Sequence, residues 1–191
     1  MSGGVESTAL AYLLRPDVCI TVDYGQPAAL GEVKQSRLIC AQLGLVHKVI
    51  SAPVYKESSR SPQQSWWPLR NQILITCASI SLQDYRNAEI IVGFVKDDIY
   101  KDCTIEFVNS INLCLGTQET GHKVVAPAIY KSTFELLEDS QFPRELLGLL
   151  FSCHFSSLPC GACPGCLKNL DVTERWHRHL DTSQCTQYDG R

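Results

Sequence analysis

Along this chain, segments with the apolar pattern of β-strands alternate with segments with the apolar pattern of α-helices. Short β-branched apolar runs, typical of buried strands, occupy residues 17–24, 46–50, 89–94 and 123–126. Apolar positions at helical spacing occupy the stretches between them, at residues 28–43, 70–85 and 104–115, and a further helical pattern follows residue 8. Strands that alternate with helices predict an α/β fold, a parallel sheet with helices on both faces.

The composition is that of a globular protein with a substantial core. The chain has 191 residues, of which 45% are hydrophobic, and a formal net charge of -3. No apolar run reaches the length of about 18 residues that spans a bilayer, and no signal peptide opens the chain, so we expect a cytoplasmic protein without a membrane partner. The slightly acidic balance argues against broad nucleic-acid binding and favours a small ligand.

The first eight residues form a motif suited to anion binding. Met-Ser-Gly-Gly-Val-Glu-Ser-Thr sets two glycines among hydroxyl residues directly before a helical pattern. Glycine lets backbone N–H groups turn inward, and a helix N-terminus adds partial positive charge. A flexible tail is the alternative. A Walker motif with its lysine is absent. We predict phosphate binding by Ser2, Gly3, Gly4, Val5, Glu6, Ser7 and Thr8.

Four cysteines near the C-terminus have the spacing of a metal site: Cys153, Cys160, Cys163 and Cys166. Prolines and glycines between them allow the tight turns that bring four thiolates to one ion. Four sulfur ligands leave no open position for substrate, so we predict a structural zinc ion that orders the C-terminal part of the chain. An iron–sulfur cluster and an accidental grouping are the alternatives.

Polar residues recur where the predicted strands end, the edge at which α/β proteins bind ligands. They are Tyr24 and Gln26 after the first strand, Arg70 and Asn71 at a helix start, Asp98 after the third strand and Lys131 after the fourth. Each alone would more often be an ordinary capping or solvated residue. Trp66 and Trp67 form either an aromatic wall against a flat base or a core edge.

Motif by motif, the chain resembles the 7-cyano-7-deazaguanine synthase family of PP-loop ATP pyrophosphatases. The matching segments follow the family's order: the loop at residues 2–8, residues 23–26, 47–49, 67–71, 93–98, 100–108, 127–131 and the cysteine cluster. The resemblance implies a Rossmann-like nucleotide-binding α/β domain over residues 1–145 and a zinc-binding lobe with a helix over residues 146–191.

The resemblance also implies a reaction. ATP with Mg²⁺ would activate the carboxylate of a 7-carboxy-7-deazaguanine as an acyl adenylate, ammonia would displace AMP, and a second activation would dehydrate the amide to the nitrile. The implied catalytic residues are Ser2, Glu6, Ser7, Arg70 and Lys131. Tyr24 and Gln26 would join the loop in binding ATP, and the implied substrate-binding residues are Arg70, Asn71, Gly93, Asp98 and Asp102. A homodimer is compatible with this assignment.

The chain departs from the family pattern at several positions. Glu6 replaces an aspartate, Leu69 replaces a glycine, and Pro27 and Thr104 replace arginines. A buried strand normally precedes the loop, whereas only Met1 precedes Ser2, so we expect either an upstream translation start or a loop held by other means. Two alternatives stay open: a paralogue that attaches a deazaguanine amide to a partner protein in an antiviral gene cluster, and a non-catalytic nucleotide-binding scaffold subunit.

Overall fold

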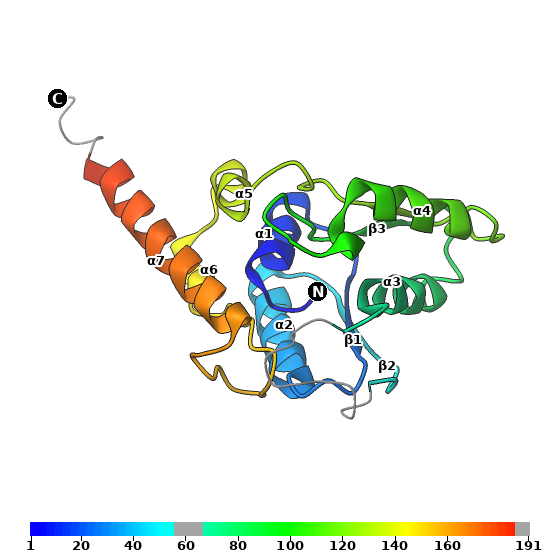
Figure 1. The fold of residues 1–191 in the computed structure, drawn as a ribbon. Helices are drawn as coiled ribbons and strands as arrows, with labels where there is room; N and C mark the ends of the chain where they lie inside the picture. Colours follow the sequence, from blue (N-terminus) through cyan, green and yellow to red (C-terminus); the bar gives the residue numbers. More distant parts are fainter. Residues whose placement is uncertain (56–66, 186–191) are drawn as a thin grey trace.

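The computed structural model describes residues 1–55 and 67–185, and its ribbon is drawn in Figure 1. The first half of the chain contains α1 (Val5–Leu14), β1 (Cys19–Asp23), α2 (Ala29–Leu43), β2 (His47–Ser51), α3 (Arg70–Ser81) and β3 (Glu89–Ile91). The second half contains the 3₁₀ turn η2 (Lys101–Cys103), α4 (Ile105–Leu115), β4 (Lys123–Val125), α5 (Thr133–Ser140), α6 (Arg144–Leu147) and α7 (Pro164–Cys185).

The strands pair in parallel, as the sequence predicted, and helices pack on both of their faces. β1 pairs with β2 and β3 pairs with β4. Neighbouring residues of one strand enter different cores, because side chains alternate along a strand. Cys19 belongs to the core formed with α1, α2 and α5 to α7, whereas Ile20 packs against the core of α3 and α4. The α/β fold class is therefore confirmed.

Met1 forms hydrogen bonds with the free edge of β1, the edge opposite β2. The N–H of Cys19 donates to Val46 beside β2, so the carbonyl of Ile20 points to the opposite edge. There it accepts a hydrogen bond from the Met1 amino group, and the Thr21 hydroxyl donates to the Met1 carbonyl over 2.7 Å. These bonds hold the start of the phosphate-loop motif against the sheet.

Two helices, α5 and α6, lie beyond the predicted elements, whereas α7 is the helix expected within residues 146–191. α5 begins with a capping box, in which Ser132 and Glu135 satisfy each other's backbone N–H groups. α6 and α7 follow, and Trp176 of α7 is 2% exposed in the same core as Ala9 of α1. In Figure 1, α7 runs along one side of the molecule as its longest helix. The division of the chain at residue 145 stays a prediction.

Two predicted elements end earlier than their apolar patterns. α3 stops at Ser81 and β3 at Ile91, because the chain turns at both points. The bend after β3 carries Gly93 against α1 and Asp98 toward the loop. Within residues 1–55 and 67–185, the structure contains no helix with both the length and the hydropathy needed to cross a bilayer.

Candidate active site

The N-terminal motif forms a compact turn at the start of α1. Gly3 has a φ of 77°, a left-handed conformation that glycine adopts without strain. The Ser2 hydroxyl accepts the Gly4 N–H over 3.3 Å and lies 3.3 Å from the Ser7 hydroxyl. The Ser7 and Thr8 hydroxyls both donate to the Gly4 carbonyl, over 3.1 and 2.7 Å. The residues of the predicted loop are thus bound to one another.

The first turn of α1 presents its backbone N–H groups without a side-chain cap. Gly4 is the N-cap residue and has no side chain to accept a hydrogen bond from the first turn of the helix. Uncapped N–H groups together with the helix dipole attract anions. The Phe151 N–H donates to the Gly3 carbonyl over 2.8 Å, so residues 151–152 fix the other side of the turn.

Glu6 joins the loop to the C-terminal helix. Its Oε1 atom lies 2.7 Å from the Lys168 ammonium nitrogen and accepts a hydrogen bond from the Thr133 hydroxyl over 2.8 Å. Lys168 also lies 3.9 Å from a carboxylate oxygen of Asp98. Burial lowers the pKa of Lys168, but the attraction of Glu6 and Asp98 outweighs it and raises this pKa above its ordinary value.

The turn after β3 supplies two further carboxylates. Asp98 accepts the Val95 N–H over 3.1 Å, and Asp97 accepts the Thr133 N–H over 2.9 Å. Burial raises the pKa of Asp98, although the Val95 N–H and the nearby Lys168 oppose the rise. Asp98 therefore lies beside Lys168, and its predicted contact with substrate stays a prediction, whereas Asp97 orients the start of α5.

Gly93 allows the close approach of this turn to α1. A Cβ atom at Gly93 would lie 3.3 Å from the Glu6 Cβ and 3.3 Å from the Ser7 backbone nitrogen. Any side chain here would push against the phosphate-loop motif. Gly93 was predicted to bind substrate, and the structure gives it this packing role beside the loop.

The start of α3 is adjacent to the same group of charges. Burial raises the pKa of both Asp98 and Glu32, and the positive charge of Arg70 opposes this rise, so its guanidinium acts on both carboxylates. The Asn71 amide donates to the Asp102 carbonyl over 3.1 Å and to the Cys103 sulfur over 3.4 Å. One carboxylate oxygen of Asp102 is buried and has no hydrogen-bond partner among the described residues.

A surface hollow opens beside Asp102. Its volume is about 590 Å³, and it is lined by Leu69, Gln72, Ile99, Tyr100, Lys101, Asp102 and Phe107. Buried polar atoms are almost always hydrogen-bonded in native proteins, so the unpartnered Asp102 oxygen is an exception, and it belongs to a residue that lines this hollow. The predicted pair Asn71 and Asp102 thus lies together at the start of α3 and η2.

Aromatic side chains gather after β1. Tyr24 stacks on Trp67 with ring centroids 5.3 Å apart and planes 5° from parallel, and Tyr55 lies at 5.9 Å from Trp67. Trp67 therefore belongs to an aromatic cluster with Tyr24, whereas Trp66 falls outside the described residues. The cluster offers flat surface at the strand end at which ligands bind in α/β proteins.

The Gln26 side chain forms hydrogen bonds with both Tyr24 and Glu32. Its amide accepts the Tyr24 N–H over 2.9 Å and donates to a Glu32 carboxylate oxygen over 2.7 Å. Gln26 is only 6% exposed. Burial raises the pKa of Glu32, while the Gln26 hydrogen bond and the Arg70 charge lower it in part. Gln26 thereby fixes the loop after β1, and its predicted contact with nucleotide stays a prediction.

Lys131 interacts with α5. Its ammonium group forms an ion pair with Asp139 on α5, and both side chains are about half exposed. The ion pair at the loop is that of Lys168 with Glu6. A catalytic part for Lys131 stays a prediction.

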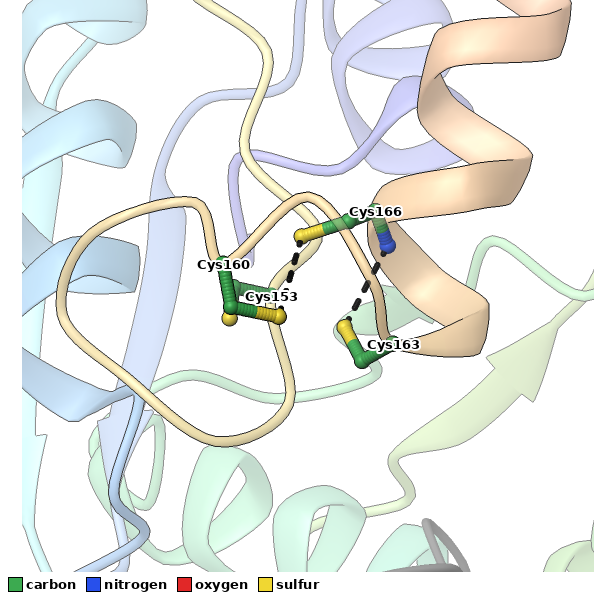
Figure 2. A group of neighbouring side chains, drawn as sticks. All are labelled: Cys153, Cys160, Cys163 and Cys166. Carbon is green, nitrogen blue, oxygen red and sulfur yellow. Dashed lines mark hydrogen bonds between the residues drawn. The ribbon is translucent and has the colours of Figure 1, made fainter.

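The four predicted cysteine ligands come together at the start of α7. Their sulfur atoms all lie within 4.8 Å of one another. Figure 2 shows Cys160 facing Cys166, with 3.9 Å between the sulfurs, and the Cys166 N–H donating to the Cys163 sulfur over 3.4 Å. Cys153 and Cys163 are buried, so the group is enclosed on most sides. These residues can hold a metal ion.

The cysteines differ in how readily they ionise. Backbone N–H groups of Ala162 and Cys163 lower the pKa of Cys160 to about 6, because they stabilise its thiolate. Burial raises the pKa of Cys166 to about 12. Metal binding requires thiolates, so a bound cation would provide the charge that offsets the burial of Cys166.

Two residues of the site, Lys168 and Thr133, could not be predicted from the sequence pattern. Lys168 stands two residues after Cys166 in a polar helix, and Thr133 follows the capping residue of α5. Both reach Glu6 only because α5 and α7 pack beside α1. Thr104, at the position of a family arginine, caps α4 by accepting the Phe107 N–H over 3.4 Å.

Comparisons with known proteins identify sequences that are similar to this chain. Residues 52–175 match the family model described as queuosine biosynthesis protein QueC. The chain is 28% identical to the 7-cyano-7-deazaguanine synthase of Methanocaldococcus jannaschii, with 88% of this chain and 90% of the relative covered. It is 24% identical to the synthase of Methanosphaera stadtmanae, with 99% of this chain and 96% of the relative covered.

A solved structure shares the fold. The U34-tRNA thiolase NcsA from Methanococcus maripaludis, solved with its [4Fe-4S] cluster, superposes with a TM-score of 0.53 at 19% identity. The match covers 95% of this chain and 71% of that protein. At this identity the likeness supports the fold alone.

Proposed function

Since this chain belongs to the queuosine biosynthesis protein QueC family and is an enzyme of that family, we propose that it is an ATP-dependent ligase. It converts 7-carboxy-7-deazaguanine and ammonia to 7-cyano-7-deazaguanine through an acyl adenylate. The observation that carries the proposal is the uncapped first turn of α1, with the Ser2 and Ser7 hydroxyls 3.3 Å apart. Such a turn suits the phosphates of ATP.

The loop stabilises the charge that develops on the phosphates. Backbone N–H groups around Gly3 and Gly4 and the hydroxyls of Ser2 and Ser7 donate to phosphate oxygens. Glu6 and Asp98 are carboxylates of the kind that hold Mg²⁺, which is supplied with ATP and neutralises phosphate charge. Most of the rate enhancement in such transfers comes from positioning and electrostatics, and this turn is fixed on both sides.

The start of α3 suits the carboxylated base. Arg70 lies among the site's carboxylates, where its guanidinium can pair with the substrate carboxylate. Asp102 has an unpartnered buried oxygen that can accept N–H groups from the edge of a guanine-like base. We therefore assign the base to the hollow beside Asp102 and its carboxylate to the side facing Arg70.

The reaction proceeds by two activations. A carboxylate oxygen attacks the α-phosphorus of ATP, releasing pyrophosphate, and ammonia then attacks the acyl carbon and displaces AMP to give the amide. The amide oxygen attacks a second ATP, and loss of AMP with the amide protons leaves the nitrile. The loop N–H groups hold the departing pyrophosphate in both activations.

The cysteine cluster is assigned a structural zinc ion. Zn–S distances of about 2.3 Å in a tetrahedron place the sulfurs about 3.8 Å apart, close to the 3.9 Å between Cys160 and Cys166. A four-iron cluster separates its thiolates more widely, since the metal atoms lie between them. Metal analysis of protein purified without chelator tests the assignment, and stoichiometric iron with inorganic sulfide would replace it.

The activity is tested by incubating the protein with ATP, Mg²⁺, ammonium and 7-carboxy-7-deazaguanine. We expect AMP, pyrophosphate and the mass of the nitrile, and we expect the double variant Ser2→Ala, Gly4→Val to form none of these products. Formation of AMP together with a protein that carries a deazaguanine amide would instead identify a paralogue that modifies proteins. A protein that binds no ATP at millimolar concentration would be a scaffold subunit.

A further inference from the structure

The first turns of α7 connect the cysteine cluster to the phosphate loop. α7 begins at Pro164 inside the cluster, and Lys168 follows Cys166 by two residues. We infer that Lys168 binds an anionic oxygen of the β- or γ-phosphate of ATP beside the loop. The inference rests on the proposed function, because it names a residue that holds the triphosphate during adenylation.

The Lys168 ammonium group is already at the loop. Its nitrogen lies 2.7 Å from a Glu6 oxygen, and Glu6 is in the first turn of α1. The distance of 3.9 Å to Asp98 is an ionic contact longer than a hydrogen bond. An ammonium group has three N–H donors, and the Lys168 side chain is 42% exposed, so donors remain for a ligand oxygen.

Glu6 holds Lys168 in this position. The same Glu6 oxygen accepts the Thr133 hydroxyl over 2.8 Å, which fixes the carboxylate from the side of α5. A lysine held by two carboxylates loses little further side-chain freedom when it binds an anion. The extra methylene of Glu6, relative to the family's aspartate, thus serves an ion pair with α7.

The loop needs a positive charge from elsewhere in the chain. Residues 2–8 contain no lysine or arginine, and their one charged side chain, Glu6, is negative. A triphosphate brought to this turn would meet that negative charge unless a cation offsets it. Lys168 offsets it directly, whereas Lys131 is engaged by Asp139 on α5.

The cysteine cluster determines where Lys168 lies. Gly165 packs so closely on residues 152–154 that a Cβ atom there would be 1.9 Å from the Ser152 carbonyl oxygen. The adjacent Phe151 N–H binds the Gly3 carbonyl. Segments on both sides of the cluster therefore contact the loop, and the cluster acts on ATP binding through the position of Lys168.

The test compares ligands that differ only in their phosphates. Calorimetric titrations with Mg-ATP, magnesium pyrophosphate and AMP are made on wild type, Lys168→Met and Lys168→Arg, without the carboxylate substrate. Lys168→Met should weaken ATP and pyrophosphate binding about tenfold or more, since a charged hydrogen bond is lost. AMP affinity should stay within about twofold, and Lys168→Arg should restore most of the ATP affinity.

A matched control is Lys123→Met on β4. Lys123 forms an ion pair of 2.8 Å with Glu89 that is remote from the loop, so its ATP affinity should equal that of wild type. Equal ATP binding by wild type and a folded Lys168→Met variant overturns the inference and leaves the proposed function standing. A wild-type protein that binds neither ATP nor pyrophosphate overturns both. If Lys168→Met does not fold, Lys168→Gln takes its place, and ATP affinity equal to wild type in that folded variant overturns the inference.

Discussion

The backbone N–H of Phe151 donates to the carbonyl oxygen of Gly3 over 2.8 Å, which joins the segment before the cysteine cluster to the loop at the start of the chain. A Cβ atom on Gly4 would lie 3.8 Å from the Phe151 carbonyl oxygen, so residue 151 lies directly against the turn. Changes in the cluster are therefore expected to reach the loop.

Gly165→Ala should destabilise the protein and weaken ATP binding. The added Cβ would overlap the Ser152 carbonyl oxygen at 1.9 Å and the His154 ring at 2.6 Å, and overpacking of this kind costs about 1–3 kcal/mol. Chemical denaturation measures the stability, and nucleotide titration measures the affinity. Gly148→Ala is the control, because nothing lies within 4 Å of its Cβ position; equal effects of the two variants would contradict the packing argument.

Leu69→Gly should stabilise the protein by about 1 kcal/mol, because it relieves a left-handed backbone conformation. Leu69 has a φ of 63° at the start of α3 and is 64% exposed, so little apolar burial is lost. The free energy of unfolding, measured with urea, should rise for Leu69→Gly. Leu69→Ala keeps the strain and should show no such gain. A less stable glycine variant would show that Leu69 packs on an unrecognised surface.

The free energy of unfolding of wild type should fall as the pH rises because Glu32 is buried, and Glu32→Gln should remove this fall. Burial raises the pKa of Glu32 in the folded state, even though Gln26, Arg70 and the Met1 amino group oppose the rise. Between the unfolded pKa of about 4.3 and the higher folded value, the folded protein retains a proton that the unfolded chain releases. The free energy of unfolding therefore falls as the pH rises through this window, and the loss is complete above the folded pKa.

The measurement for Glu32→Gln is a series of urea titrations between about pH 4 and pH 8. The variant should gain stability over wild type as the pH rises, because the neutral amide still accepts the Gln26 hydrogen bond. Glu119→Gln, at an exposed position, is the matched control. A flat profile for Glu32→Gln would contradict the raised pKa.

Cys163→Ser should abolish stoichiometric metal binding and lower the thermal midpoint by several degrees. Loss of one of four ligands opens the site, and metal binding energy contributes to the folding of small metal-bound lobes. Elemental analysis and calorimetry give the two readouts. Cys114→Ser, at an exposed cysteine on α4, should change neither. Retention of the metal by Cys163→Ser would indicate that another residue completes the site.

Much of the site could be predicted because its parts are local in the sequence. The glycines and hydroxyls of residues 2–8 and the cysteines of residues 153–166 form their turns with near neighbours. Lys168 could not be predicted this way. Its position depends on how α7 packs beside α1 and α5, and a single lysine in a polar helix has the same pattern as a solvated one.

Periodicity and spacing are properties of short segments, so they predict the alternation of strands and helices, the turn at residues 2–8 and the four-cysteine group. Packing of the whole chain brings Met1 to the free edge of β1 and lets Thr133 and Lys168 share Glu6. Those contacts join residues far apart in the chain, and they form because burial of the common apolar core brings α1, α5 and α7 together.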